Sequence, residues 1–105
     1  MREIMRLVFT QAKDNLLVKF GCFELLGFDF IIDDQLKLQL IEINVNPAIF
    51  TDTPVQLDLL PGLIDESVNL ALKLHENNED LTAKKETIDE AVESLKNYEL
   101  LSRFD

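Results

Sequence analysis

The stretch Gly21–Pro47, GCFELLGFDFIIDDQLKLQLIEINVNP, decides the fold of this chain. It holds two apolar runs separated by Asp33-Asp34-Gln35, and both runs are rich in the β-branched and aromatic residues that strands favour. Asp residues tolerate turn geometry and hydrogen-bond their own backbone. The pattern therefore predicts an antiparallel hairpin with strands within residues 23–32 and 36–45. The near-continuous apolar runs favour a sheet that is buried on both faces.

Three polar side chains lie where a core strand would carry Val or Leu: Asp29, Glu42 and Asn44. If the loop is even, with Asp34 opposite Lys37, then Asp29 lies directly across from Glu42. Strand periodicity then puts Asn44 on the same face, one pleat along. A loop of the other parity would separate the two carboxylates.

Two carboxylates directly opposite each other repel, and half-burying them costs free energy unless a cation is present. With an amide oxygen they make a hard ligand set that suits Mg²⁺, which takes one or two carboxylates, waters and substrate phosphates. The alternative is that Asp29 and Glu42 are solvated, or paired with Lys or Arg from elsewhere. The spacing alone leaves both interpretations open.

The segments FELLGFDF (residues 23–30) and LIEINVNP (residues 40–47) resemble the tubulin–tyrosine-ligase-like family. These are ATP-grasp ligases that add tyrosine, glutamate or glycine to protein carboxylates. The resemblance covers roughly residues 1–75. Its core is FELxGxD, followed thirteen residues after the Asp by E-x-N, then by a Pro-containing loop and a helix.

The resemblance implies an α+β fold: an antiparallel β-hairpin packed with flanking helices, the C-terminal portion of an ATP-grasp fold. It implies that Asp29, Glu42 and Asn44 bind the Mg²⁺ ions of ATP and that Ile41 packs near the nucleotide base. No catalytic residue is separable from these metal ligands. ATP and Mg²⁺ are the implied cofactors.

The chain departs from the family pattern at two places. Leu38-Gln39 stands where many members carry Pro-Trp, and Asn46-Pro47 stands where many carry Ser-Pro. The Asn-Pro version looks more like the glycine-adding branch. Neither departure touches the implied metal ligands, so the departures bear on which amino acid is transferred.

Charge limits the partners of this chain. It carries 10 basic and 20 acidic residues in 105, a net charge of −10. Such a surface is a poor partner for nucleic acid, for anionic membranes and for acidic tubulin tails. Cys22 is the only cysteine, which excludes a disulfide framework, and we expect a buried thiol. With no signal-peptide pattern and no long apolar run, the expected compartment is the cytoplasm, with the cytoskeleton or a cilium as narrower alternatives.

The flanking segments predict helices. Apolar spacing predicts a helix over residues 2–18, either laid against the sheet or facing a phosphate or acidic tail with its basic side. Thr53-Pro54 is a helix start, Pro61-Gly62 is expected to interrupt or restart that helix, and the stripe continues to Glu76. His75 at its end is most simply a solvated cation near the negative end of the helix dipole. The loop 46–53 either contacts substrate or only connects the hairpin to the following helix.

The predicted domains are a ligase-like subdomain, residues 1–76, and an acidic extension, residues 77–105. Within the extension, Leu81, Ile88, Val92, Leu95 and Tyr98 predict a further helix, and the capping-box pattern at Thr87–Glu90 allows a start later than residue 81. That helix would dock on the domain or on a partner helix, or be mobile.

Two functions from different classes fit the sequence. The first is the C-terminal part of an ATP-dependent ligase that adds an amino acid to tubulin or another acidic protein and takes the free amino acid as co-substrate. No phosphate-binding loop is recognisable, so we expect the 105-residue chain to be inactive alone. The second is a small acidic interaction module on a ligase-like scaffold. A simple divalent-ion binder fits the ligand set but lacks the ligand-dense loop of a Ca²⁺ site. The sequence predicts no oligomeric state.

Overall fold

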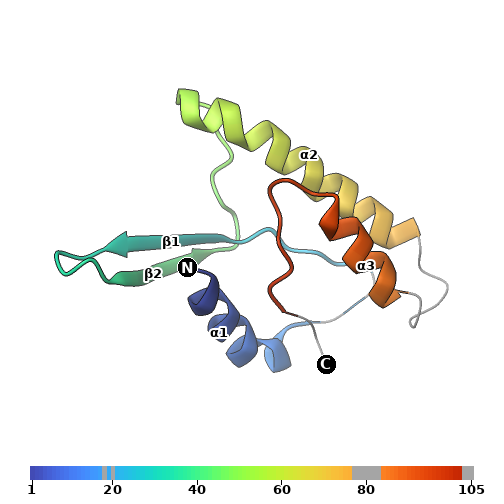
Figure 1. The fold of residues 1–105 in the computed structure, drawn as a ribbon, viewed down its shortest axis with the longest axis horizontal. Helices are drawn as coiled ribbons and strands as arrows, with labels where there is room; N and C mark the ends of the chain where they lie inside the picture. Colours follow the sequence, from blue (N-terminus) through green and yellow to red (C-terminus); the bar gives the residue numbers. More distant parts are fainter. Residues whose placement is uncertain (18, 20, 77–83, 103–105) are drawn as a thin grey trace. The chain divides into compact units, whose positions relative to one another are not determined.

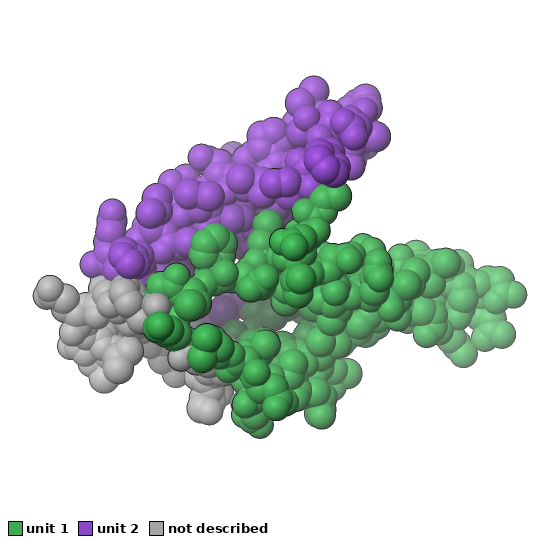
Figure 2. Space-filling view, turned by 180° about the vertical axis from the view of Figure 1, so that it is seen from behind, with its two compact units in different colours: residues 1–48, 101–105 green, residues 49–100 purple. Residues whose placement is uncertain are grey.

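The structure, a computed structural model, describes residues 1–17, 19, 21–76 and 84–102, with the backbone alone over 84–88. Its elements are α1 (Arg2–Ala12), the short 3-10 helix η1 (Lys13–Asn15), β1 (Gly27–Ile32), β2 (Leu38–Asn44), α2 (Pro54–Glu76) and α3 (Lys84–Glu93) (Figure 1). They fall into two compact units, one of Met1–Ala48 with Leu101–Asp105 and one of Ile49–Leu100 (Figure 2). The described part of the chain is thus α+β with a two-stranded antiparallel sheet.

The predicted pairing of Asp29 with Glu42 is present, but the loop that was expected to produce it is not. Near the turn Ile32 pairs with Leu38 and the Asp33 N–H donates to the Lys37 carbonyl at 2.9 Å, so Asp34 does not lie opposite Lys37. The loop is therefore odd.

A β-bulge in the second strand corrects the register. It lies between the pairs Phe30↔Leu40 and Asp29↔Glu42, and Ile41 is the extra residue. The bulge restores the pairing of the two carboxylates that the odd loop would have separated.

Side-chain patterning explains the bulge. In β2 the alternation of apolar and polar residues changes phase at the adjacent apolar pair Leu40-Ile41. The extra residue keeps one face of the hairpin apolar; this apolar face consists of Phe28, Phe30, Ile32, Leu38, Leu40 and Ile43. Phe28 and Phe30 stack on it with ring centroids 6.3 Å apart. Without the bulge, Leu38 and Leu40 would move to the face of Asp29.

The opposite face of the hairpin carries Gly27, Asp29, Ile31, Gln39, Glu42 and Asn44. No residue of either strand is buried, and Ile31 on this face is 53% exposed. The expectation of a sheet buried on both faces is therefore wrong for this chain. Alternation of apolar and polar residues is typical of antiparallel pairs with one wet face.

Of the two Asp residues that predicted the turn, Asp33 organises it. Its carboxylate accepts from the backbone N–H groups of Gln35 at 3.0 Å and Lys37 at 2.8 Å, and from Gln39 Nε2 at 3.2 Å. The Lys37 backbone bond, then the Gln39 bond, hold the pKa of Asp33 below its ordinary value. Leu36, expected in the second strand, lies instead in the turn with φ +62.

The segment before β1 differs from its prediction. Strand geometry begins at Gly27, not near Phe23, and Cys22 is exposed rather than buried. Gly21 acts as a breaker: it has φ +80, and the Cys22 N–H donates to the Lys19 carbonyl at 3.1 Å to close a turn.

Helix α1 confirms the start of the predicted amino-terminal helix, with Ile4, Met5, Val8 and Phe9 half-buried and no residue fully buried. The predicted end near residue 18 is wrong, because α1 ends at Ala12, a 3-10 turn follows, and Leu16 is extended. Whether α1 is laid against the sheet stays a prediction. Arg6 pairs with Glu3 at 3.0 Å on its exposed side.

Helix α2 begins as predicted and then runs through its proline. Thr53 Oγ1 accepts from the Gln56 N–H at 3.2 Å, and Gln56 Oε1 accepts from the Thr53 N–H at 3.0 Å, which forms a reciprocal cap. The helix continues past Pro61 to Glu76, so the expected interruption is absent. His75 is exposed in the last turn, as expected. No helix within the described ranges is long and apolar enough to cross a membrane.

Helix α3, described from Lys84 to Glu93, confirms that a further helix is present. Leu95 and Tyr98 lie beyond its end, so the predicted helix is too long there, and Leu81 and the side chain of Ile88 lie outside what the structure describes. The segment that follows α3 docks on α2 through polar contacts. Glu66 accepts from the backbone N–H groups of Lys96 and Asn97, both at 3.0 Å, and from Asn97 Nδ2 at 3.1 Å. The Tyr98 hydroxyl bonds Ser67 Oγ. Among the described residues only Ala91 on α3 is buried, with 7% exposure.

Candidate metal site

The hairpin brings the three predicted ligands onto one face. Asp29 on β1 pairs directly with Glu42 on β2, and Asn44 lies one pleat along, opposite Gly27. Asn44 Nδ2 donates to Asp29 Oδ2 at 3.1 Å. This bond uses the nitrogen of the carboxamide and leaves its oxygen, the atom that can bind a hard cation, outside the bond.

Burial and charge are compatible with a cation here. Asp29 and Glu42 are exposed and Asn44 is half-buried. Within the described part of the chain neither carboxylate forms an ion pair with Lys or Arg, and no group of three or more His, Cys, Asp or Glu side chains could hold a metal. The candidate ligand set would be the two carboxylates and the one amide. This donor chemistry fits Mg²⁺, which keeps several waters and substrate oxygens, while solvated carboxylates also fit the exposure.

The β-bulge lies directly beside these ligands. Its extra residue is Ile41, the residue expected near the nucleotide base, and its side chain is 61% exposed. Bulges often lie next to active sites, where they change the direction of a side chain. The bulge therefore makes Ile41 an exposed apolar surface adjacent to Glu42.

Gly27 and Pro47 are in close contact at the end of the hairpin. A Cβ placed on Gly27 would lie 2.9 Å from Pro47 Cβ and 3.7 Å from Asn44 Cβ. Only glycine fits opposite Asn44 while Pro47 occupies this position.

Comparison with known proteins supports the resemblance noted in the sequence. The model of the tubulin-tyrosine ligase family matches residues 1–81. The chain belongs to this family. It is 44% identical over 73 residues to "Protein polyglycylase TTLL10" of Macaca fascicularis, covering 70% of this chain and 12% of that protein.

Other relatives carry different printed activities. "Inactive polyglycylase TTLL10" of Homo sapiens is 42% identical over 70% of this chain and 11% of its own length. "Tubulin polyglutamylase ttll-5" of Caenorhabditis elegans is 40% identical over 66% of this chain and 10% of its own length. The chain thus spans about a tenth of the length of the curated relatives it matches. No solved structure matches it.

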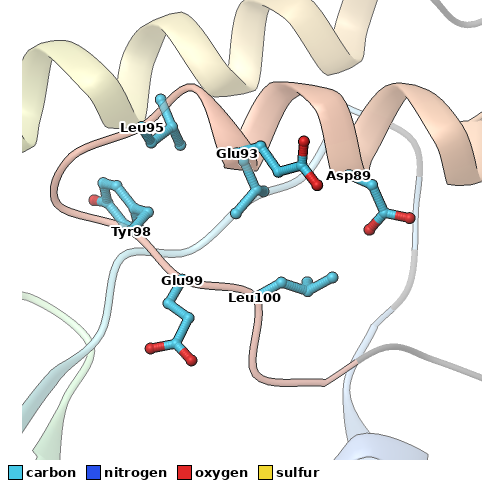
Figure 3. Close-up of a pocket in the computed structure, with 7 residues that line it drawn as sticks. Asp89, Glu93, Leu95, Tyr98, Glu99 and Leu100 are labelled. Carbon is cyan, nitrogen blue, oxygen red and sulfur yellow. The ribbon is translucent and has the colours of Figure 1, made fainter.

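The family match includes every predicted ligand and ends before a cavity in the other compact unit. This cavity of about 370 Å³ is lined by Asp89, Val92, Glu93, Leu95, Tyr98, Glu99 and Leu100. Figure 3 shows Asp89 and Glu93 on α3, and Tyr98, Glu99 and Leu100 on the segment that follows it. It holds none of the predicted site residues.

Sequence reasoning missed Gly27 and the bulge. Both left a signal. A glycine inside a strand pattern suggests a bulge or a close backbone approach. The doublet Leu40-Ile41, which changes the phase of an otherwise alternating strand, marks the bulge itself.

Proposed function

We propose that this chain supplies the Mg²⁺–ATP ligands of an ATP-dependent ligase of the tubulin-tyrosine ligase family, within the C-terminal portion of an ATP-grasp fold. The ligase adds an amino acid, with glycine favoured over glutamate and tyrosine, to a carboxylate of tubulin or another acidic protein. Asp29, Glu42 and Asn44 hold the metal, and Ile41 contacts the base. The 105 residues alone do not complete the reaction.

One observation carries the proposal: the direct pairing of Asp29 with Glu42, with Asn44 bonded to Asp29 on the same face. Because the chain belongs to this ligase family, we favour a metal-binding role for this arrangement over a pairing of two carboxylates without function. The preference for glycine rests on the names of the relatives, since several of those matched are polyglycylases.

The chemical contribution of this chain is electrostatic. In the ligase reaction ATP phosphorylates the acceptor carboxylate, and the amine of the incoming amino acid displaces phosphate. Mg²⁺ supplies charge neutralisation on the phosphate oxygens when it is bound. Asp29 and Glu42 contribute negative charge for that cation, and the Asn44–Asp29 hydrogen bond orients the carboxamide.

The first experiment tests the ligand set on the chain itself. Mn²⁺, a paramagnetic substitute for Mg²⁺, is titrated into the ¹⁵N-labelled chain with and without ATP, and NMR line broadening is followed. We expect broadening centred on Asp29, Glu42 and Asn44 that strengthens when ATP is added. Asp29→Ala and Glu42→Ala should abolish it, while Asp34→Ala, which removes a turn carboxylate of the same hairpin, should leave it unchanged. Equal broadening in all variants would refute the site.

The second experiment tests the ligase activity. The native polypeptide, captured from cell extract with an antibody against residues 77–105, is incubated with tubulin, ATP, Mg²⁺ and labelled glycine, glutamate or tyrosine. We expect ATP-dependent incorporation of glycine, lost in Asp29→Ala and Glu42→Ala. Incorporation that survives both substitutions would exclude the proposed role.

The alternative function, an acidic protein-interaction module, has one specific observation in its favour. The hairpin and α2 expose large apolar side chains, with Val55 67% and Leu57 61% exposed, as a docking surface would. An acidic interaction module would respond to neither Mn²⁺ nor ATP and would retain a protein partner after Asp29→Ala. Under either function we place this protein in the cytoplasm. As a ligase it would act at the cytoskeleton or a cilium.

A further inference from the structure

Gly27 has no need of glycine for its backbone conformation. Gly21 is the glycine with a positive φ among the described residues, and Gly27 is not. Gly27 is the first residue of β1 and pairs with Asn44, where glycine offers no side chain to pack and loses more conformational freedom on folding than any other residue. The reason for glycine at this position is therefore space.

The space is taken by Pro47. The 2.9 Å that would separate a Cβ at Gly27 from Pro47 Cβ is shorter than real Cβ contacts, so something would have to move. The proline atom belongs to a closed ring joined to the backbone and is not the flexible end of a side chain. An alanine at this position would therefore displace the backbone around Pro47.

Such a displacement would reach the ligand set by a short route. Pro47 follows Asn44 after only a two-residue bend, Val45-Asn46. Asn44 itself lies opposite Gly27, and its Cβ would be 3.7 Å from the new methyl group. The 3.7 Å contact with Asn44 is ordinary, so the strain would come from the clash with Pro47. That clash would shift the segment that anchors Asn44, and its 3.1 Å bond to Asp29 would lengthen.

We propose that Gly27 is a positioning residue: the space left by its missing side chain seats Pro47, and this contact holds the Asn44 carboxamide against Asp29. The consequence for metal binding rests on the proposed function. The geometric part does not, because the Asn44–Asp29 bond exists without a metal.

The test substitutes the residues on both sides of the Gly27–Pro47 contact, separately and together. Gly27→Ala introduces the clash. Pro47→Gly removes the opposing Cβ but keeps Pro47's Cα position, which is 3.7 Å from a Cβ at residue 27 and so in ordinary contact. Pro47→Ala keeps a Cβ and is the matched control for the rescue. Gly62→Ala controls for the glycine-to-alanine change, because its new Cβ meets only Asn97 Nδ2, at 3.6 Å.

The first readout needs no metal. In the ¹⁵N-labelled chain we expect Gly27→Ala to shift the side-chain NH₂ signals of Asn44. Gly27→Ala/Pro47→Gly should return them toward the wild-type positions, and Gly27→Ala/Pro47→Ala should not. Unshifted Asn44 signals in Gly27→Ala, or equal behaviour of the two double variants, would overturn the inference. If Gly27→Ala alone does not fold, a folded spectrum recovered by Gly27→Ala/Pro47→Gly but not by Gly27→Ala/Pro47→Ala supports the inference, and failure of both double variants to fold contradicts it.

The second readout is the Mn²⁺ dissociation constant. Loss of a group that orients a metal ligand typically weakens binding about 10- to 100-fold, and we expect Gly27→Ala to lie near the lower end. The Pro47→Gly double variant should recover most of the loss, while Gly62→Ala should match the wild type. If the wild-type chain shows no Mn²⁺ broadening at all, the proposed function fails, and the Asn44 signals still decide the role of Gly27.

Discussion

Leu36 is the residue with the least favourable backbone in the hairpin. It has φ +62 in the turn and its side chain is 86% exposed. The left-handed region costs an L-residue roughly 1–2 kcal/mol, and glycine avoids this at the cost of greater freedom in the unfolded chain. The exposed side chain offers little packing in return.

Leu36→Gly should therefore stabilise the hairpin by roughly 0.5–1 kcal/mol. The measurement is amide exchange of the Asp33 N–H, which bonds the Lys37 carbonyl. It should slow about two- to fivefold when opening is local. Leu36→Ala keeps the Cβ and should show no gain. Equal slowing by alanine and glycine would trace the effect to lost apolar exposure and contradict the backbone explanation.

The same turn shows what the residues could and could not predict. The turn was predicted from its Asp residues, because an Asp carboxylate readily accepts from backbone N–H groups close to it in sequence. Loop parity could not be predicted, because an odd loop requires a left-handed residue and leucine gives no signal of one. The pairing of Asp29 with Glu42 was predicted correctly only because the bulge at Ile41 compensates for the odd loop.

At the scale of elements, α2 shows local signals that succeed at its start and fail in its middle. Thr53 and Pro54 predicted the start correctly, since capping depends on neighbours in sequence. Pro61 removes one N–H from the helix ladder, and this was expected to interrupt it. The helix continues because the residues on both sides keep one apolar stripe, including Leu60 and Ile64, which are half-buried.

Pro61→Ala should stabilise α2 by about 1–3 kcal/mol, because it restores a donor for the Leu57 carbonyl and removes the ring from the preceding turn. Urea unfolding followed by circular dichroism measures this. Gly62→Ala serves as the comparison, with an expected gain of roughly 0.5–1 kcal/mol from helix propensity alone. Destabilisation by Pro61→Ala would mean that the proline ring makes packing contacts worth more than the lost hydrogen bond.

The contact of α2 with the segment after α3 depends on a titrating group. Backbone N–H groups of Lys96 and then Asn97 hold the pKa of Glu66 below its ordinary value. At acid pH the unfolded chain therefore binds more protons than the folded chain. The stabilisation by Glu66 is present above the ordinary glutamate pKa and is lost as pH falls through the lowered folded-state value.

We expect the Lys96 and Asn97 amide signals to stay constant at neutral pH and to move only below the ordinary glutamate pKa. An NMR pH titration measures the midpoint. Glu66→Gln keeps an acceptor oxygen but cannot titrate, so its amide signals should lack this transition. A midpoint at or above the ordinary value would show that the hydrogen bonds do not favour the ionised form.

At the scale of the molecule, composition and family pattern predicted the α+β class and the family correctly. The extent of burial was not predictable from them: 47% of residues are apolar, yet Ala91 is the only described residue that is buried. Hydrophobic periodicity identifies which face of an element is apolar. It cannot identify what covers that face, and in the matched relatives this segment is about a tenth of a much longer chain.

Net charge sets the last expectation. The chain carries −10, so it should repel the acidic carboxylate-rich peptides that a tubulin-modifying ligase would recognise. We expect no binding of a glutamate-rich peptide to the chain at low ionic strength, where attraction would be strongest. The recognition charge for such a substrate would then come from outside these residues.

A contrary result would have a specific source. Binding that weakens steeply with salt would point to the basic side of the amino-terminal segment, which includes Lys13 and Lys19. Lys13→Glu should then abolish it, while Lys73→Glu, the same charge change near the end of α2, should not. Equal loss of binding in both variants would instead trace the binding to the net charge of the chain. A local site depends on the position of the substituted lysine, whereas long-range attraction depends only on net charge.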